Sequence, residues 1–559
     1  MLRSSFPGAT SGRVLAPEDV TVVIPIGRDG NRDWLDQAIR SFPEGTKYLV
    51  LENDGELAEA KNEGAKAAET PFVQFFDADD VALPDFLENL RSMAWNADVV
   101  YPTMILTSED LTEPLGTHLA FPFCGNRLLD FNFVSGSSLV RREKFLEVGG
   151  FDPSFPVWED WDLWVRMYRA GAHFKPCTQA KMIYRQHSYS RSQTEIDPEQ
   201  IRKRIIGEPD PALEYKATFY TQATPATTYV RCQLPSRYLP GKVLQQLVWA
   251  GGHYPQQRGD AAILQFPGDK ATALHGLMMK QEGLRCLVEV DDNYLIHPGK
   301  RVLDRSGWSM EVGGKESSRN GHRWIAEHAD GVIVTTPWLA DRYRKVNPNV
   351  YVCPNGVDPP DWPEPEKPDD GILRILWSAG PSHDIDIPLA ARAMEWASRQ
   401  KDVEVYVAGL ETGWDFAKTY PWLGELDLYR KLPQGFDIGI APVRQTAHGM
   451  GRSDLKALEY AMGTVCPVMS DLAPYDAWKD GENCLKAKDA KGFYKAIRRL
   501  VENRDEVKQL ADAARSYVLK ERTAQVQRSY WLEAIEDGKT RSGSIGSSRS
   551  PVKRTLQAA

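Results

Sequence analysis

Short apolar runs alternate with amphipathic segments in the first part of the chain. Residues 20–27, 48–53 and 71–76 are apolar and rich in β-branched or aromatic side chains, as buried strands are. Between them, residues 32–42 and 56–69 carry apolar side chains at helical spacing. Alternation of this kind predicts a parallel sheet flanked by helices.

The same alternation resumes in two later parts of the chain. Apolar runs follow one another at residues 261–268, 285–292, 329–336 and 350–357. A stretch rich in proline and acidic residues, 358–371, interrupts the pattern before it restarts at residues 372–380. We therefore predict two further α/β units joined by a stiff hinge.

The boundaries between these units follow from changes in composition. Residues 193–228 are polar, charged and contain proline, which indicates a partly helical connector. The last residues are poor in apolar side chains and carry five basic residues without an acid, which indicates disorder. The predicted division is a flexible N-terminus at 1–19, a first domain at 20–195, a connector at 196–225, a second domain at 226–360, a third domain at 371–535 and a disordered basic tail at 539–559.

Composition narrows the class of protein. With 42% hydrophobic residues among 559, the chain can form several packed cores. Its seven cysteines include no CxxC pair, which favours reduced thiols in a cytoplasm-like compartment over disulfides or structural zinc. Because no apolar stretch suits a signal peptide or a membrane span, we expect a cytoplasmic protein without stable membrane insertion. A net charge of −9 disfavours nucleic acid as a partner.

Three acids, Asp77, Asp79 and Asp80, follow the apolar run at 71–76 with almost no spacer. The carboxyl end of a buried strand is where open α/β sheets bind their ligands. Clustered carboxylates repel one another unless a cation lies between them, and Mg²⁺ or Mn²⁺ prefers oxygen ligands shared with substrate phosphates. The pattern predicts a metal-nucleotide site. The alternative is a solvated turn that caps a helix starting near residue 81.

A second acidic cluster, Glu159, Asp160 and Asp162, stands at the start of an amphipathic segment that we expect to end at Gly171. Acids in the first turn of a helix stabilise it by roughly 0.3–1 kcal/mol per charge, which is the structural explanation. Three acids exceed what capping needs, so this cluster is a second candidate for chemistry.

The order of four motifs resembles that of the family 2 glycosyltransferases of the GT-A fold. The motifs are the acids at 77–80 (a DxD motif), GSSLVRREKFLEVGGFDPSF at 136–155, WEDWD at 158–162 and YRQHSYSRS at 184–192. The resemblance covers residues 20–195. It implies an α/β, Rossmann-like nucleotide-diphospho-sugar transferase domain.

This resemblance implies roles for individual residues. Asp77 and Asp79, with His187, would hold Mn²⁺ or Mg²⁺ on the diphosphate of a nucleotide-sugar donor. Asp160 would be the general base that takes the proton of the acceptor hydroxyl. Two further donor-binding residues, in the pocket for the nucleotide base, would be Pro25 and Asp54.

Residues 225–530 resemble another group, the family 4-like glycosyltransferases of the GT-B fold, with 436–485 in the donor-side domain. Such a pair of Rossmann-like domains holds a nucleotide diphosphate without a metal, by helix N-termini and a positive side chain. The resemblance implies that Lys456 contacts the diphosphate, Glu459 the ribose, and Gly380 and His383 a phosphate. An i,i+3 ion pair between Lys456 and Glu459 is the alternative. The acid that the family places eight positions before Glu459 is Gly451 here.

Together the two resemblances imply a bifunctional, tandem glycosyltransferase, similar to transferases of bacterial surface-glycan loci and bacteriophage genomes. It would act in the cytoplasm, or in the host cytoplasm if it is phage-encoded. A metal-dependent, inverting GT-A domain and a metal-independent GT-B-like pair would add two sugars in succession to a glycan precursor or a protein. One alternative is a single active GT-A transferase with a non-catalytic GT-B-like acceptor-binding pair, and another is a non-catalytic glycan-binding scaffold. The donor sugar, the acceptor and the oligomeric state stay open.

Overall fold

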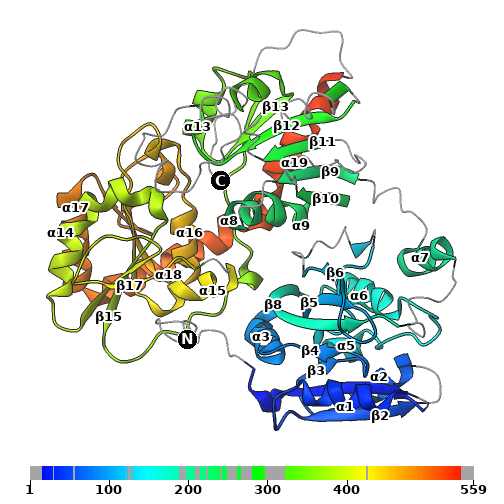
Figure 1. Cartoon of the computed structure of the whole chain (residues 1–559). Helices are drawn as coiled ribbons and strands as arrows, with labels where there is room; N and C mark the ends of the chain where they lie inside the picture. The colour runs from blue at the N-terminus through cyan, green and yellow to red at the C-terminus, as the bar shows by residue number, and fades with distance from the viewer. Residues whose placement is uncertain are drawn as a thin grey trace.

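The computed structural model describes residues 15–28, 30–53, 57–120, 123, 128–129, 131–187, 197–207, 215–221, 225–239, 242–247, 261–265, 280–281, 283–295, 322–423 and 426–542. These residues form three sheets, one in the first domain (blue to cyan in Figure 1) and two in the rest of the chain. The predicted α/β class is confirmed. Asp54, most of the predicted N-terminus and the predicted tail beyond Ser542 lie outside the described residues.

The first sheet has the strand order β2-β1-β3-β7-β5-β8-β4, with β6 paired to β5. β1 runs parallel to β2 and β3, whereas β7 runs antiparallel to β3 and β5. The strands are β1 (Val20–Gly27), β2 (Tyr48–Asn53), β3 (Phe72–Phe75), β4 (Val81–Ala82), β5 (Val99–Thr107), β6 (Pro114–His118), β7 (Leu139–Arg141) and β8 (Phe174–Arg185). The helices are α1 (Arg32–Arg40), α2 (Leu57–Ala67), α3 (Phe86–Met93), α5 (Arg142–Glu147), α6 (Glu159–Arg169) and α7 (Pro198–Ile206).

Two hydrophobic clusters cover the two faces of this sheet, because successive side chains of a strand point to opposite faces. On β1, Val22 and Ile24 pack into a cluster that includes residues of α1 and α3. Val23 packs into the other cluster, with residues of α2 and α6. The unbroken apolar run of β1 is therefore what a parallel strand with both faces covered requires.

The second and third sheets are parallel throughout, with the orders β10-β9-β11-β12-β13-β14 and β17-β16-β15-β18-β19-β20. The strands of the second sheet are β9 (Tyr215–Thr221), β10 (Lys242–Leu247), β11 (Ala261–Gln265), β12 (Arg285–Val290), β13 (Gly331–Val334) and β14 (Val350–Val352). Those of the third sheet are β15 (Leu373–Ser378), β16 (Val403–Ala408), β17 (Lys418–Tyr420), β18 (Ile438–Ala441), β19 (Cys466–Ser470) and β20 (Leu485–Ala487). The accompanying helices are α8 (Pro225–Thr228), α9 (Leu234–Tyr238), α13 (Pro337–Tyr343), α14 (Ile387–Ser398), α15 (Leu426–Lys431), α16 (Leu455–Met462), α17 (Ala490–Glu502), α18 (Arg504–Glu521) and α19 (Ala524–Ser542).

Elements at the domain boundaries pack differently from the predicted division. The predicted connector contains α7, whose Ile205 joins the core of the first domain, and β9, which lies inside the second sheet. The long helix α19 runs past residue 535, and its Trp531 and Ile535 pack into the core of the second sheet. Figure 1 shows this red helix beside the green strands. An amphipathic segment buries one stripe only, so its average composition is polar even where it completes a core.

The acid-rich stretch at 358–371 begins as a packed junction. Asp361 is buried, and its carboxylate accepts hydrogen bonds from the hydroxyl of Tyr229 and from Arg237 Nη1, the latter at 2.7 Å. Its other oxygen lies 3.0 Å from Nε2 of His173, in the first domain. A buried carboxylate is costly unless it is paired. These contacts tie the stretch to the first domain through His173 and to the second domain through Tyr229 and Arg237.

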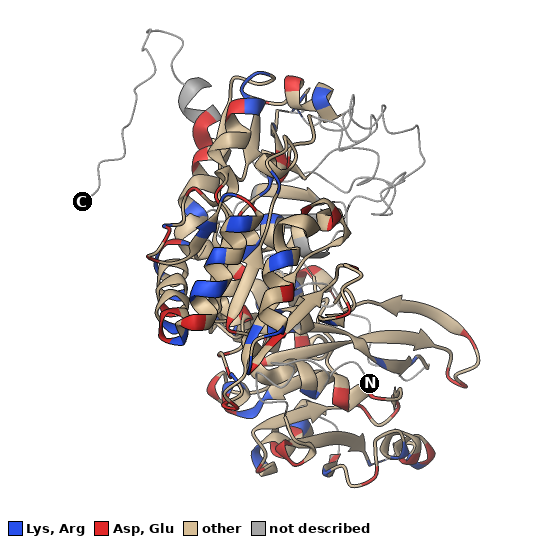
Figure 2. Cartoon of the chain, turned by 90° about the vertical axis from the view of Figure 1, so that its left-hand side faces the viewer, with Lys and Arg blue, Asp and Glu red and all other residues tan. Residues whose placement is uncertain are grey.

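Charged residues are dispersed over the surface. Acidic and basic residues lie side by side along the helices of the face drawn in Figure 2. Pairs such as Arg498–Glu502 and Lys508–Asp512 are spaced i,i+4 and are exposed. None of the described helices combines the length and the apolar character that crossing a bilayer requires.

Candidate active sites

The acids at 77–80 form a tight turn directly after β3, where the backbone N–H of Asp80 donates to the carbonyl of Asp77 at 3.2 Å. The turn leads into the short strand β4, and α3 begins only at Phe86, after Asp85. The three acids therefore do not cap a helix. Their alternative explanation as a capping turn is wrong.

Burial and mutual repulsion raise the pKa of two of these acids. The carboxyl of Asp79 is raised by burial and by the charge of Asp77, and that of Asp80 is raised well above its usual value by burial, Asp79 and Asp77. Within the described part of the chain, Oδ2 of Asp80 is buried and accepts no hydrogen bond. A cation at this turn would relieve both effects.

Arg185, at the end of β8, holds the acidic turn in place. Its Nε donates to the carbonyl of Asp79 at 2.9 Å and its Nη2 to Oε1 of Gln37 at 2.8 Å. The guanidinium lies 4.8 Å from the ring centre of Trp34. Two residues later, Nε2 of His187 lies 2.8 Å from Oδ2 of Asp79, so the sequence-predicted pair meets in the structure.

Asp160 lies in the first turn of α6, after Trp158, whose backbone is left-handed at φ 62°. Its Oδ1 accepts from the N–H of Trp161 at 2.8 Å, and its Oδ2 accepts from the amide of Asn132 at 2.9 Å. Burial and the like charge of Glu159 raise the pKa of Asp160 to about 7. A carboxyl poised near neutral pH is suited to proton transfer.

Lys61 of α2 connects the two acidic clusters, and the sequence analysis missed it. Its side chain is 5% exposed, and its Nζ lies 2.9 Å from Oδ1 of Asp77. Burial by itself lowers the pKa of this ammonium, but the charges of Asp77, Glu159 and Asp160 outweigh that effect and raise it. A lysine among the small residues of a predicted buried helix face was the available signal, because a buried ammonium requires acidic partners.

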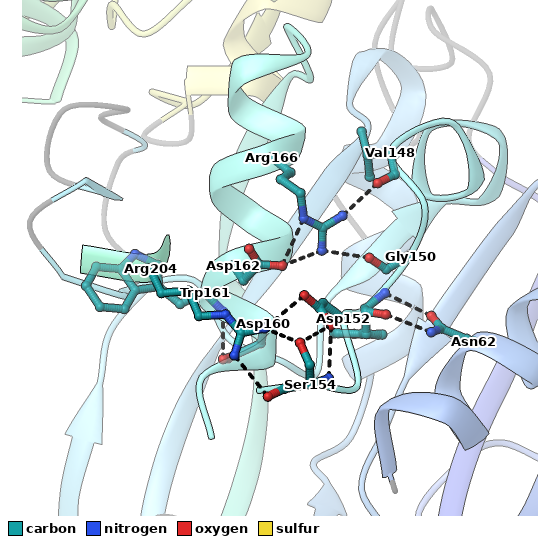
Figure 3. A network of polar contacts seen from close by, with 11 residues as sticks. Asn62, Val148, Gly150, Asp152, Ser154, Asp160, Trp161, Asp162, Arg166 and Arg204 are labelled. Carbon is teal, nitrogen blue, oxygen red and sulfur yellow. Dashed lines mark hydrogen bonds and ion pairs between the residues drawn. The ribbon is translucent and has the colours of Figure 1, made fainter. Parts of the chain in front are cut away.

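The stretch around 148–166 is a scaffold for this site (Figure 3). Arg166 binds Oδ2 of Asp162 through Nε at 2.9 Å and donates to the carbonyls of Val148 and Gly150 at 2.7 Å each. Asn62 makes two hydrogen bonds of 2.8 Å with the backbone of Phe151. Gly150 has φ +73°, and a Cβ there would lie 2.4 Å from Oδ1 of Asn62, so only glycine fits. Asp162 therefore has a cationic partner in Arg166, whereas the two hydrogen bonds of Asp160 come from neutral groups.

Pro25 lies on β1, where it is buried and opposite Leu51 of β2. Register also places Gly27 opposite Asn53 at the carboxyl ends of these strands. Asp54 follows immediately and lies outside the described residues, so the predicted base pocket is described only in part.

The donor set of the acidic turn fits a hard cation held jointly with a diphosphate. Mg²⁺ and Mn²⁺ are commonly bound by one or two carboxylates, with substrate phosphates completing the shell. Asp77 and Asp79 supply two carboxylates at one turn, and burial together with the charge of the neighbouring acids raises the pKa of Asp79 and Asp80. Among the described residues, no group of three or more His, Cys, Asp or Glu side chains is arranged to hold a metal ion by itself.

The candidate site of the third domain is lined by cations. His383 follows β15, and its Nδ1 lies 2.8 Å from Oδ2 of Asp386. Its Nε2 lies 2.6 Å from Nη1 of Arg452, which the sequence analysis did not single out. Burial and the charge of Arg452 lower the pKa of His383 to about 4, so the imidazole is neutral at pH 7 and accepts from Arg452.

Lys456 and Glu459 share a face of α16 and pair with each other. Nζ of Lys456 lies 2.8 Å from Oε2 of Glu459, and both contact the hydroxyl of Tyr429. Burial by itself lowers the pKa of Lys456, but Glu459 outweighs it and raises the pKa. The i,i+3 ion pair considered from the sequence is thus present, and the roles on diphosphate and ribose stay predictions.

Gly380 lies beside an exposed tryptophan that the sequence analysis did not identify. A Cβ on Gly380 would lie 3.5 Å from the ring of Trp422, and one on Gly409 would lie 2.8 Å from it. Trp422 is 58% exposed, and its ring lies beside Gly380 and Gly409, which follow the carboxyl ends of β15 and β16. An exposed ring at that edge can stack on a nucleotide base.

Gly451 is glycine because the second domain packs against it. A Cβ there would lie 2.6 Å from Cβ of Asn293 and 3.3 Å from Oδ1 of Asp292, both in the loop after β12. The place of the acid that the family 4-like pattern has at this position is therefore closed by the facing domain. His448, three residues earlier, lies 3.5 Å from the same oxygen of Asp292.

Comparison with protein families identifies one segment. Residues 45–195 match the family described as "Glycosyltransferase like family 2". The segment contains Asp77, Asp79, Asp160 and His187 and spans less than half of the chain. This match supports a sugar-transferring enzyme, as the sequence analysis predicted. A search of curated proteins finds no match to this sequence.

Solved structures with a similar fold include three that illustrate the degree of likeness. Sucrose-phosphate synthase from Thermosynechococcus elongatus is 12% identical, and the match covers 59% of this chain and 98% of that one at a TM-score of 0.42. A glycosyltransferase from Rickettsia africae is 11% identical, with coverage of 58% and 98% and a TM-score of 0.41. HepE from Anabaena, in complex with UDP and glucose, is 10% identical, with coverage of 57% and 99% and a TM-score of 0.41. Likeness at this level bears on neither substrate nor mechanism.

Proposed function

We propose that the chain is a tandem glycosyltransferase with one nucleotide-sugar site in the first domain and another between the second and third. The observation that carries the proposal is the position of Lys61, which pairs with Asp77 and interacts with the charge of Asp160. Sugar transfer needs positive charge at the departing diphosphate and a base at the attacking hydroxyl. The candidate metal-holding acid, Asp77, and the candidate base, Asp160, both interact with the ammonium of Lys61.

In the first site, Asp77 and Asp79, with His187 beside them, would hold Mn²⁺ or Mg²⁺, which when bound neutralises the charge that develops on the diphosphate. Asp160 takes the proton from the acceptor hydroxyl. As the new bond from that oxygen to the anomeric carbon forms, the bond from the anomeric carbon to the diphosphate breaks, which inverts the configuration. Asn132, which donates to Oδ2 of Asp160 at 2.9 Å, orients the base.

In the second site, the cations of the chain take the place of a metal. Arg452 and Lys456 carry positive charge on the third domain, where the neutral imidazole of His383 accepts from Arg452 and lies beside Asp386. Trp422 offers its exposed ring to the nucleotide base. The acceptor of the tandem reaction is a glycan precursor or a protein, which tethering would present to the second site after the first transfer.

One observation favours a second candidate function, a single active transferase in the first domain. Gly451 leaves no room for the acid of the family 4-like pattern, and Glu459 is already paired with Lys456. The GT-B-like pair would then bind the acceptor or a nucleotide sugar without transferring it.

A panel of nucleotide sugars tests the proposal on the intact chain. We expect Mn²⁺-dependent release of nucleoside diphosphate that is lost in Asp160→Asn. We also expect a second binding event and a second release of nucleoside diphosphate that survive both EDTA and Asp160→Asn and are weakened in Arg452→Met. Binding at the second site without any Asp160-independent transfer would favour the single-transferase alternative. A chain that neither binds nor hydrolyses any nucleotide sugar would refute the proposed function.

A further inference from the structure

A pocket of about 340 Å³ lies between the second and third domains, outside the donor sites described above. Its walls come from the loop after β12, from residues 322–328, from α13 and the turn that follows it, and from the loop after β18. The residues that matter for its chemistry are Asn293, Arg323, Trp338, Arg342, Lys345 and Ala447.

The two domains touch at one wall of this pocket. Nδ2 of Asn293 donates to the carbonyl of Ala447 at 3.1 Å, and the loop of Asn293 packs on Gly451, next to Arg452. A ligand in the pocket would therefore contact both domains. The lining residue Ala447 precedes Arg452 and Lys456, the cations of the second donor site, by only a few positions in the sequence.

Among the residues that the structure describes, the lining carries three basic side chains and no acidic one. Arg323 pairs with Glu327 at 2.9 Å, and Arg342 stacks on the ring of Trp338 at 3.8 Å from its centre. Within the part of the chain that the structure describes, no carboxylate pairs with Arg342 or Lys345. The neighbouring acid Asp341 instead pairs with Arg344 at 2.8 Å. Among the described side chains that line this pocket, positive charge is therefore in excess.

We propose that this pocket binds an anionic sugar, which is the acceptor of the GT-B-like pair. The phosphate or carboxylate of the sugar would be held by Arg342 and Lys345, because charge-assisted hydrogen bonds are the strong ones. Trp338 provides an apolar wall for the sugar ring, and the volume is at the lower end of that of small-ligand pockets. The assignment of an acceptor role rests on the proposed function, whereas the binding of the anionic sugar does not.

Calorimetry on the intact chain tests the binding with four probes: glucose 6-phosphate, glucuronate, glucose and inorganic phosphate. We expect glucose 6-phosphate or glucuronate to bind at least about tenfold more tightly than glucose, and whichever of the two binds better identifies the anionic group. Inorganic phosphate should bind more weakly than the anionic sugar, because it lacks the ring that packs on Trp338. Equal affinity for phosphate and glucose 6-phosphate, or no preference over glucose, would overturn the proposal.

Two variants and one control locate the binding. Lys345→Gln and Arg342→Gln should each weaken binding of the anionic sugar by roughly tenfold. Arg344→Gln removes an equal charge from the adjacent position, which is paired with Asp341 and does not line the pocket, so it should change affinity less than about twofold. Lys345 is exposed, so its variant folds even if loss of the Arg342 stack disturbs α13. Equal effects in Lys345→Gln and Arg344→Gln would refute the location.

Nucleotide-sugar turnover, measured on the same preparations, separates the two proposals. Binding of the anionic sugar without any nucleotide-sugar binding would leave the pocket assigned and would refute the transferase function. Donor turnover without any preference for anionic sugars would refute the pocket and leave the transferase function standing.

Discussion

The two candidate donor sites solve the same electrostatic problem with opposite charges. At the carboxyl end of β3, the chain gathers acids, and burial together with their mutual repulsion raises the pKa of Asp79 and Asp80. One buried lysine, Lys61, pairs with Asp77 beside them. Between the second and third domains, the chain instead gathers Arg452 and Lys456 around a neutral His383. If both sites bind a diphosphate as proposed, the first would need a cation to offset its carboxylates and the second would not.

The two sites also differ in how many domains build them. The acidic site is built within one domain, on elements tied together by Asn62, Arg166 and Arg185. The cationic site lies on the third domain, next to Gly451, against which the loop of Asn293 packs from another domain. The first should therefore depend on protons and metal, and the second on salt and on how the two domains meet.

The largest expected effect comes from Asp160→Asn, which leaves an isosteric side chain that cannot take a proton. Transfer by the first site should fall by roughly 10²-fold or more, the usual contribution of a positioned base. The free energy of unfolding should change by about 1 kcal/mol, since one hydrogen bond is altered. Initial rates and melting curves on the same preparations check this. If Asp160→Asn keeps near wild-type transfer, Asp160 is not the base, and the acids at 158–162 only stabilise the first turn of α6.

Removal of divalent metal should affect only the first of the two sites. In calorimetric titrations of the intact chain with a nucleotide sugar, EDTA should abolish one of two binding events, because only the first site needs a cation to offset its carboxylates. Asp77→Asn with Asp79→Asn should abolish the same event in the presence of Mn²⁺. Persistence of both events in EDTA would remove the metal role from these two residues.

Arg452→Met tests the cationic site. Loss of one charge-assisted contact should weaken EDTA-resistant nucleotide binding by roughly tenfold and leave Mn²⁺-dependent binding unchanged. Arg498→Met is the matched control, because Arg498 is exposed on α17 and pairs with Glu502. An unchanged affinity in Arg452→Met would remove the donor-binding role proposed for this residue.

The pH dependence of the first site should follow Asp160. Because the base must be ionised and its pKa is raised to about 7, transfer should fall below that pH by about tenfold per unit, and the limb should vanish in Asp160→Asn. The pKa of Asp160 is about 7 in the folded protein and about 3.8 in the unfolded chain. Between these two pH values the unfolded chain has lost the proton that the folded protein keeps, so the free energy of unfolding falls as the pH rises from about 4 to about 7. Asp160→Asn should lack this fall. A rate that is flat from pH 5 to 8, measured at saturating donor, would contradict the assignment.

Asp162→Asn should have the smallest effect on transfer, within about twofold, measured well below the melting temperature. Its cost lies in stability: the pair with Arg166 is largely buried, and its loss should lower the free energy of unfolding by about 1–3 kcal/mol. Glu147→Gln, which alters an exposed pair with Lys144, should cost at most about 1 kcal/mol. A loss of transfer as large as in Asp160→Asn would mean that the two acids do not differ in role.

The sequence determined the three α/β units and the acidic turn of this protein. Alternating apolar runs and amphipathic segments predict β1, β2, β3 and the helices between them, because each element must bury a face of fixed period. The position of the acids at the carboxyl end of β3 could be predicted too, because they follow the strand directly in the sequence. Polar segments such as α7 and α19 were misplaced because their membership of a core depends on one stripe of residues, such as Ile205 and Trp531.

Only the tertiary structure decided which charges meet. Lys61 lies on a helix after β2, yet it pairs with Asp77 after β3 and lies near Asp160 on α6. From the sequence, Gly451 stands where the family 4-like pattern has an acid. The structure shows that the loop of Asn293, from another domain, packs against Gly451 and leaves no room for a side chain. Local patterns fix periodicity and strand ends, whereas contacts between residues distant in sequence depend on how helices and domains pack, which no short stretch of sequence encodes.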